Sequence, residues 1–231
     1  MQRTESKVDA TGRDEKNLYV VGGVSALLLG VGYLVIFPLY AKVGAPPSSG
    51  EAWFTYLPGK LSVWWAILGL SVFTDFLFVP LALALYSALK STNRTAMQLA
   101  TAFVGLFVAL DLAVTWSHYA SILNLFGKYS AATDETQRAS YLAAANYGSA
   151  ILTSPLEIVY AIVTLSSAIL IVGLVMVKGE FDKTTAYLAL ATGVLGVASL
   201  TGLSFAIIGN ALFATAWLFC VGYRLCRLAR R

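Results

Sequence analysis

The sequence predicts an all-α, polytopic membrane protein, a bundle of six transmembrane helices with both termini in the cytoplasm. Of its 231 residues, 58% are hydrophobic and only 12% are charged, whereas a soluble domain carries about 25% charged residues. The apolar residues fall into long blocks, and several of these exceed the length of about 20 residues that spans a bilayer core. A mean hydropathy of +0.73 agrees with this fold class.

Six apolar blocks, separated by polar or Gly- and Pro-rich segments, predict the six helices. They cover roughly residues 18–40, 61–89, 95–126, a block that ends near 177, 184–201 and 204–225. We therefore expect a cytoplasmic tail at 1–17, one membrane domain at 18–227 and a basic tail at 228–231.

Local signals define two of the connections. Pro46 and Pro47, followed by a Ser-Gly run, predict a loop without regular structure between the first two helices. The fourth block begins outside the membrane, where Thr133 is suited to cap a helix that continues to about residue 177. Pro155 is expected to break this block into an extramembrane lead-in and the membrane span itself.

Basic residues set the predicted orientation. Twelve of the 16 Lys and Arg residues lie at the two termini and in the turns after the second and fourth helices. Positive charge accumulates on the cytoplasmic side of a membrane. We therefore expect a protein of the cell inner (plasma) membrane with both termini in the cytoplasm. Five aromatic residues are then expected in a belt at the outer interface: Trp53, Phe54, Tyr56, Trp64 and Trp65.

Three of the 12 acidic residues interrupt apolar blocks, namely Asp75, Asp111 and Glu157. His118, the only histidine, follows Asp111 two turns later on nearly the same helical face. Apart from Arg224 at the end of the last block, no Lys or Arg lies within the predicted spans. A carboxylate at the middle of a span costs about 2.5–3.5 kcal/mol, so acids in such positions indicate a functional site by default.

The predicted depths of these residues agree with one another. Counted from the cytoplasmic helix ends, Asp75, Asp111 and Glu157 lie at heights of roughly 21, 24 and 30 Å, in the outer half of a core about 30 Å thick. His118 is expected close to Glu157. Consecutive antiparallel helices commonly pack side by side, so we expect these four residues to line one outward-opening cavity. Low dielectric and like charges both disfavour ionisation, so at least one acid is expected to hold a proton.

A transporter or ligand-binding membrane protein is the function that such a cavity predicts, with a proton, a small cation or a small amphiphile as its ligand. In the alternative, each acid only joins helices through hydrogen bonds to hydroxyl groups such as that of Thr115. The protein would then be a structural accessory subunit of a larger membrane complex. Trp116 is interpreted as an interfacial anchor, and Asn210 as an interhelical contact or a helix-start residue.

Most catalytic classes lack their residues in this chain. Zinc hydrolysis normally uses two or three His or Cys ligands, and di-iron bundles need Glu-x-x-His pairs, whereas the chain has one His. Cys220 and Cys226 form neither a disulfide framework nor a zinc pattern. Phosphate loops and nucleic-acid modules are absent from the sequence. The sequence thus leans against an enzyme and against a nucleic-acid partner. It leaves the lipid bilayer, a larger complex or a homo-oligomer as partners, and any metal, cofactor or ligand undefined.

Two stretches, "DLAVTWSHYASI" and "YLAAANYGSAILTSPLEIVYAIVTLSSAILIVGLVMVKGEF", resemble a family of small bacterial six-helix membrane proteins. That family is catalogued as a domain of unknown function. The resemblance covers most of residues 18–227 and includes the closing "GYRL". It implies a bacterial inner-membrane protein with six helices, and it assigns no activity and no role to any residue.

Overall fold

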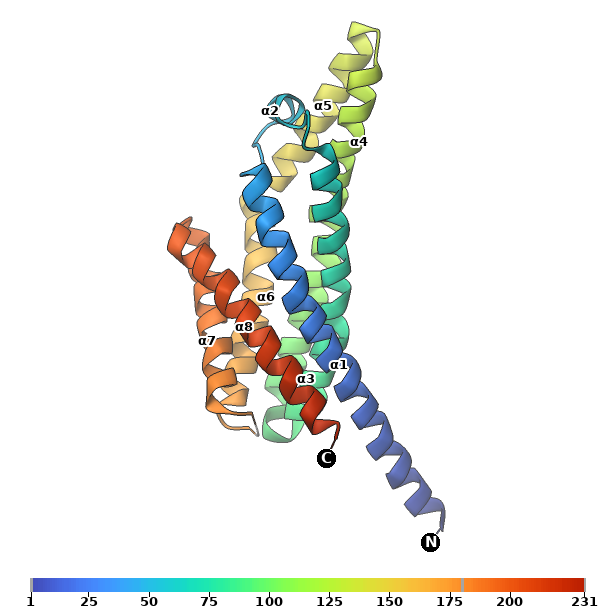
Figure 1. Cartoon of the computed structure of the whole chain (residues 1–231), viewed down its shortest axis with the longest axis vertical. Helices are drawn as coiled ribbons and strands as arrows, with labels where there is room; N and C mark the ends of the chain where they lie inside the picture. The colour runs from blue at the N-terminus through green and yellow to red at the C-terminus, as the bar shows by residue number, and fades with distance from the viewer. Residues whose placement is uncertain (1, 180, 231) are drawn as a thin grey trace.

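The computed structural model describes residues 2–179 and 181–230, and within them the chain is helical apart from short connections (Figure 1). Met1 and Arg231, the outermost residues of the two predicted tails, lie outside this described part. The α-helices are α1 (Gln2–Val43), α2 (Gly50–Tyr56), α3 (Leu61–Leu110), α4 (Ser117–Ala131), α5 (Glu135–Leu152), α6 (Pro155–Met176), α7 (Lys183–Ala198) and α8 (Ser204–Leu228). A π-helix (Asp111–Trp116) joins α3 to α4, and a 3-10 helix (Ser199–Thr201) follows α7.

Among the described residues, five helical stretches are long and apolar enough to cross a membrane. These are Asp14–Val43, Leu61–Ala131, Pro155–Met176, Lys183–Thr201 and Ser204–Leu228. The predicted all-α fold is confirmed, and the apolar helices agree with a membrane protein of several passes. Both chain ends lie at the same end of the bundle, which we call the inner end, and the opposite end is called the outer end (Figure 1).

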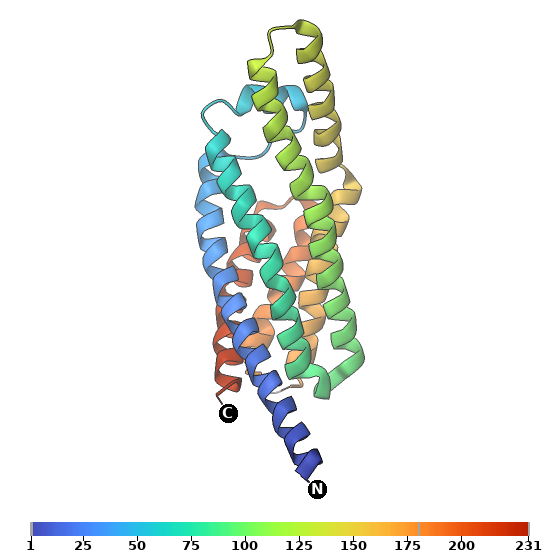
Figure 2. The same cartoon turned by 90° about the vertical axis from the view of Figure 1, so that its right-hand side faces the viewer.

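The second of these stretches is 71 residues long and reverses direction within α3. Asn93 has φ −157° and ψ 94°, which are extended rather than helical values, and its side chain accepts a hydrogen bond from Ala96 N at 3.1 Å. This is the bond of an N-cap residue. In Figure 2 the chain descends to this point and then ascends beside itself. Phe78 and Phe107 meet edge to face across the two halves, with ring centroids 5.8 Å apart.

The connection between α1 and α3 differs from its prediction, because it contains the short helix α2. The two prolines lie before this helix, and Ser49 caps it by accepting a hydrogen bond from Ala52 N at 3.2 Å. Gly50 lies so close to α5 that a Cβ there would be 2.5 Å from Asn146 N. The amide oxygen of Asn146 accepts a hydrogen bond from Gly50 N at 2.8 Å. Tertiary contact with α5 therefore orders a segment that its own composition marks as irregular.

The predicted break at Pro155 is confirmed. Helix α5 ends at Leu152, and α6 begins at Pro155 with Ser154 as its N-cap. At the other end of α5 the cap is Asp134, whose carboxylate accepts from two backbone N–H groups, rather than the predicted Thr133. Helices α4 and α5 form a hairpin that projects beyond the rest of the outer end (Figures 1 and 2).

Helix α1 packs against α3 and α8, and α6 packs against α3 and α7. Buried apolar side chains form two clusters, a large one toward the inner end and a smaller one under α2 at the outer end. The outer cluster corrects the predicted aromatic belt. Trp53 and Trp64 are 1% and 0% exposed, so they pack inside the bundle, whereas Trp65 is 39% exposed.

Candidate functional site: two carboxyl groups joined by one indole

The three predicted acids are all buried inside the bundle. Asp75 lies on the descending half of α3, Asp111 begins the π-helix, and Glu157 lies in the first turn of α6. Their exposed fractions are 4%, 6% and 9%, respectively. Three residues that are distant in sequence thus each place one carboxyl group inside the protein.

Trp116 joins the two aspartates. Its indole Nε1 lies 2.8 Å from Asp75 Oδ2 and 3.0 Å from Asp111 Oδ2. A single N–H group therefore faces both carboxyl groups, which makes them neighbours. We call Asp75 and Asp111 the acid pair, and Trp116 its donor.

The π-helix makes this arrangement possible. Residues five apart in a regular α-helix point about 140° away from one another, so Asp111 and Trp116 would face different neighbours. A π-helix instead repeats its hydrogen bonds from i to i+5, which brings these two side chains onto one face. Such single-turn π segments occur frequently at functional sites.

Glu157 is held by the same π segment but through a different residue. Thr115 Oγ1 donates a hydrogen bond to Glu157 Oε1 at 2.9 Å. The backbone N–H of Glu157 donates to Ser154 Oγ at 3.1 Å. Because Glu157 lies in the first turn of α6, the positive end of the helix dipole also favours a negative charge there. The hydroxyl of Thr115 was among the partners that the sequence predicted.

Tyrosine and tryptophan rings lie close to these acids. Tyr119 lies beside Trp116 with ring centroids 5.6 Å apart, and it stacks on Trp64 at 5.4 Å. Tyr160 lies one turn after Glu157 on α6, and its hydroxyl is buried without a hydrogen-bond partner among the described residues. The site is therefore amphipathic, with carboxyl groups set into an aromatic wall.

Basic side chains are not the partners of these acids. Within the described part of the chain, the two ion pairs are Glu15 with Lys90 and Asp182 with Arg224. Both lie near the inner end of the bundle, where α3 reverses and where α7 begins. The same described residues contain no group of three His, Cys, Asp or Glu side chains that could hold a metal ion.

His118 contacts other residues than the acid pair and its donor. Its Nδ1 is 2.6 Å from Val114 O, and its ring faces Tyr147 and Gly148 of α5. None of the contacts described for His118 joins it to the three acids. The prediction assumed a regular α-helix from Asp111 onward, and the wider π turn rotates every later residue relative to that phase.

Trp116 is the site residue that sequence reasoning missed, because it was interpreted as an interfacial anchor. Its half-buried ring instead points its N–H group into the bundle. The sequence does place a tryptophan five residues after Asp111, but in a regular α-helix this spacing puts the two side chains on different faces. Asn210 was interpreted as an interhelical contact or a helix-start residue, and the first is found, since its Nδ2 donates to Thr192 O of α7 at 2.8 Å.

The arrangement can hold a positive charge. Two carboxylates of like charge in a medium of low dielectric repel one another strongly, and a proton or cation between them relieves this repulsion. One indole N–H group stabilises a negative oxygen but carries no full charge of its own.

No protein-family model, curated protein or solved structure matches this chain.

Proposed function

We propose that this protein is a small transporter or ligand-binding membrane protein whose acid pair, Asp75 and Asp111, holds a proton or a small cation. The observation that carries the proposal is the single N–H group of Trp116, at 2.8 and 3.0 Å from both carboxyl groups. No basic residue balances the pair among the described contacts. Glu157, bound to the adjacent Thr115, is a third member of the site, whereas His118 makes no described contact with the acids.

The proposed topology has six membrane passes with both termini in the cytoplasm of a bacterial cell. The reversal of α3 at Asn93 divides its long apolar stretch into two passes, which adds one to the five candidate stretches. The excess of Lys and Arg at the inner end supports a cytoplasmic inner end. On this orientation the acid site lies toward the external face, and the α4–α5 hairpin projects outside the cell.

A shared proton is the simplest way to keep the acid pair stable. Two ionised carboxyl groups side by side cannot both be satisfied by one donor, and water is scarce within a bilayer core. In pairs of this kind the protons leave in two steps that belong to the pair rather than to either residue. Entry of a small cation in exchange for that proton is the reaction that such a pair supports.

Reconstitution of the full chain into liposomes tests this function. We expect Na⁺ or K⁺ uptake, or proton movement, to exceed that of empty liposomes when an opposing pH gradient is imposed, as followed by trapped fluorescent indicators. Asp75→Asn and Asp111→Asn should each abolish the movement while the protein stays folded, because an amide cannot exchange a proton. Asp134→Asn is the matched control, since this exposed acid serves only as the N-cap of α5 and asparagine caps equally well.

A structural accessory role is the competing function, and one observation favours it. Each of the three acids accepts a hydrogen bond from a protein donor, as an acid that only joins helices would. In that case the wild-type protein moves neither protons nor cations above the empty liposomes. It would also co-purify with a fixed membrane partner, and the Asp→Asn variants would weaken that assembly or the fold alone.

A further inference from the structure

A cavity lies between α1, α3, α6, α7 and α8. Its volume is about 150 Å³. Among the described residues that line it, none is charged. Polar side chains enter from four helices, and they are Tyr33, Ser166, Thr192 and Asn210. The remaining wall is aromatic and aliphatic, with Phe37, Phe78 and Trp217 as its largest side chains.

The polar side of this cavity has unused hydrogen-bonding capacity. Asn210 donates a hydrogen bond from one of its N–H groups to Thr192 O at 2.8 Å, and this bond fixes the plane of its amide. An amide offers one further N–H group and a carbonyl oxygen, and neither is engaged in the hydrogen bonds described. Gly196 makes room for this polar group, because a Cβ there would lie 2.2 Å from Ser166 Oγ and 3.0 Å from Asn210 Nδ2.

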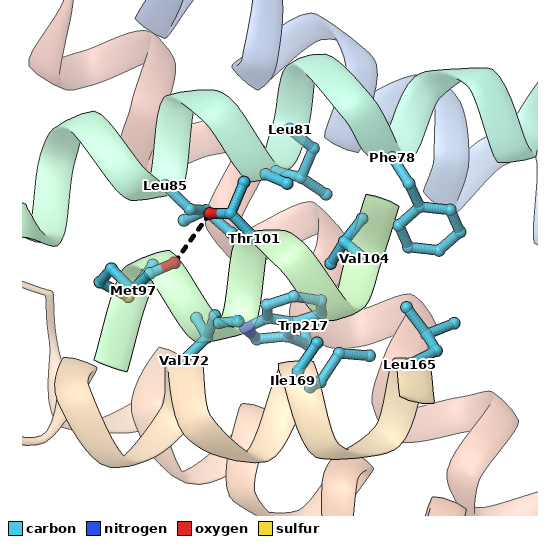
Figure 3. Close-up of a pocket in the computed structure, with 13 residues that line it drawn as sticks. Phe78, Leu81, Leu85, Met97, Thr101, Val104, Leu165, Ile169, Val172 and Trp217 are labelled. Atoms are coloured by element: carbon cyan, nitrogen blue, oxygen red, sulfur yellow. Dashed lines mark hydrogen bonds between the residues drawn. The ribbon is translucent and has the colours of Figure 1, made fainter. Parts of the chain in front are cut away.

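Trp217 forms the apolar boundary and carries an unpartnered donor. It is 2% exposed, and its Nε1 is buried without a hydrogen-bond partner among the described residues. A narrower apolar cavity lies on its other side, and Figure 3 shows its indole there with the nitrogen toward Val172. The two cavities share Phe78, Leu165, Ile169 and Trp217, so they adjoin through this indole.

Size, charge and polarity together define what such a cavity accepts. A cavity of about 150 Å³ holds one benzene-sized molecule. An ion would find no opposite charge in this lining, and an unpaired charge within a bilayer core is costly. A purely apolar molecule would leave the buried amide and hydroxyl groups without partners, which also costs free energy.

We propose that this cavity binds a small uncharged amphiphile, a ring-sized molecule that carries one hydroxyl or carbonyl group. The polar group of the ligand bonds to Asn210 and Ser166, and its ring packs on Phe37, Phe78 and Trp217. None of the described lining residues is an acid, so the proposal does not depend on the acid pair. Failure of one leaves the other intact.

The test uses 4-fluorophenol and fluorobenzene as probes of equal ring size. Binding to the full chain in detergent micelles is measured by the ¹⁹F line width against protein-free micelles. We expect the wild-type protein to bind 4-fluorophenol, and Ala214→Leu, which fills the cavity, to reduce that binding at least tenfold. Ala216→Leu is the matched control, because Ala216 is exposed on the opposite face of the same helix. Ala211→Leu fills the same cavity and replaces Ala214→Leu if the latter does not fold.

A second variant tests the polar contact. Asn210→Ala enlarges the cavity but removes the amide, so the preference for 4-fluorophenol over fluorobenzene should fall by about five- to tenfold, as expected for one hydrogen bond. A charged probe of the same ring, 4-fluorobenzylammonium, should not bind. The proposal is overturned if 4-fluorophenol fails to bind, if the filled cavity binds it equally well, or if Asn210→Ala leaves the preference unchanged.

Discussion

Two regions of this bundle are held together by different interactions: the region of the three acids, here called the outer half, and the region where α1 packs on α3 and α8, here called the inner half. In the outer half, hydrogen bonds run between side chains of different elements, from Trp116 to Asp75 and from Thr115 to Glu157. In the inner half, small residues let backbones approach closely. A Cβ added at Gly22 would lie 2.2 Å from Ala84 Cβ, and one added at Gly23 would lie 3.0 Å from the backbone of α8.

The difference indicates that close packing stabilises the inner half, whereas specific hydrogen bonds to buried acids stabilise the outer half. Helix association in membranes relies on close packing of small residues, because lipid tails are as apolar as the helices themselves. The inner half follows this rule. The outer half instead buries three carboxyl groups, each of which needs a donor, so its stability depends on a few specific side chains.

Trp116→Phe is expected to have the largest effect on stability. The ring remains, but both aspartates lose their shared donor, at a cost of about 2–3 kcal/mol in the free energy of unfolding. Trp217→Phe is the control, since its N–H group has no described partner. Packing alone would make the fully buried Trp217 the more sensitive residue. A larger loss for Trp217→Phe in denaturant titration would therefore contradict the role given to Trp116.

Gly22→Ala tests the inner half and should cost about 1–2 kcal/mol, because the new methyl group collides with α3. Gly105→Ala is the matched control, since a Cβ at that position meets no atom within 4 Å. Its effect should be neutral or slightly stabilising, as alanine favours a helix over glycine. Equal loss of stability for the two variants would mean that the inner half does not depend on close backbone contact.

Thr115→Val should cost about 1 kcal/mol, because Glu157 loses its described hydroxyl donor while the side-chain volume is kept. Thr101→Val is the control, since the hydroxyl of Thr101 bonds only to Met97 O of its own helix. The difference between the two variants, measured by denaturant titration, reports the interhelical bond. Equal losses of stability for the two variants would contradict the hydrogen bond between Thr115 and Glu157.

The smallest effect is expected at the inner end, where Asp182 bonds to Arg224 Nε at 2.7 Å. Burial by itself would raise the pKa of Asp182, but the hydrogen bonds from Arg224 and Thr185 outweigh it and lower the pKa below the ordinary 3.8. A lowered pKa in the folded state stabilises the protein above pH 3.8, and this contribution is lost as the pH falls through the folded value. The pair is partly exposed, so we expect less than about 1 kcal/mol.

Unfolding of the wild-type protein and of Asp182→Asn at pH 6 and at pH 3 measures this contribution. The wild-type protein should be the more stable at pH 6, and the difference should shrink at pH 3. Asp14→Asn, at an exposed acid that makes none of the described hydrogen bonds, should show no such change. A difference that grows on acidification would have the wrong sign for this ion pair.

Much of the helical order was predictable from local signals. The break at Pro155, the turn near Asn93 and the boundary between α7 and α8 follow from proline, polar and glycine residues that act within one turn of the chain. Helix α2 was not predictable in this way. It depends on the contact of Gly50 with Asn146, which lies 96 residues later in the sequence.

The helical class, the apolar stretches and the three acids that interrupt them can be read from the residues alone, because hydropathy and helix boundaries are local properties. That Asp75 and Asp111 share one indole N–H group is known only from the folded arrangement. That outcome depends on how two halves of α3 pack and on a single π turn, which changes the phase of every residue after it. Side-chain direction across such a turn cannot be obtained from α-helical spacing, since the spacing itself is what the fold alters.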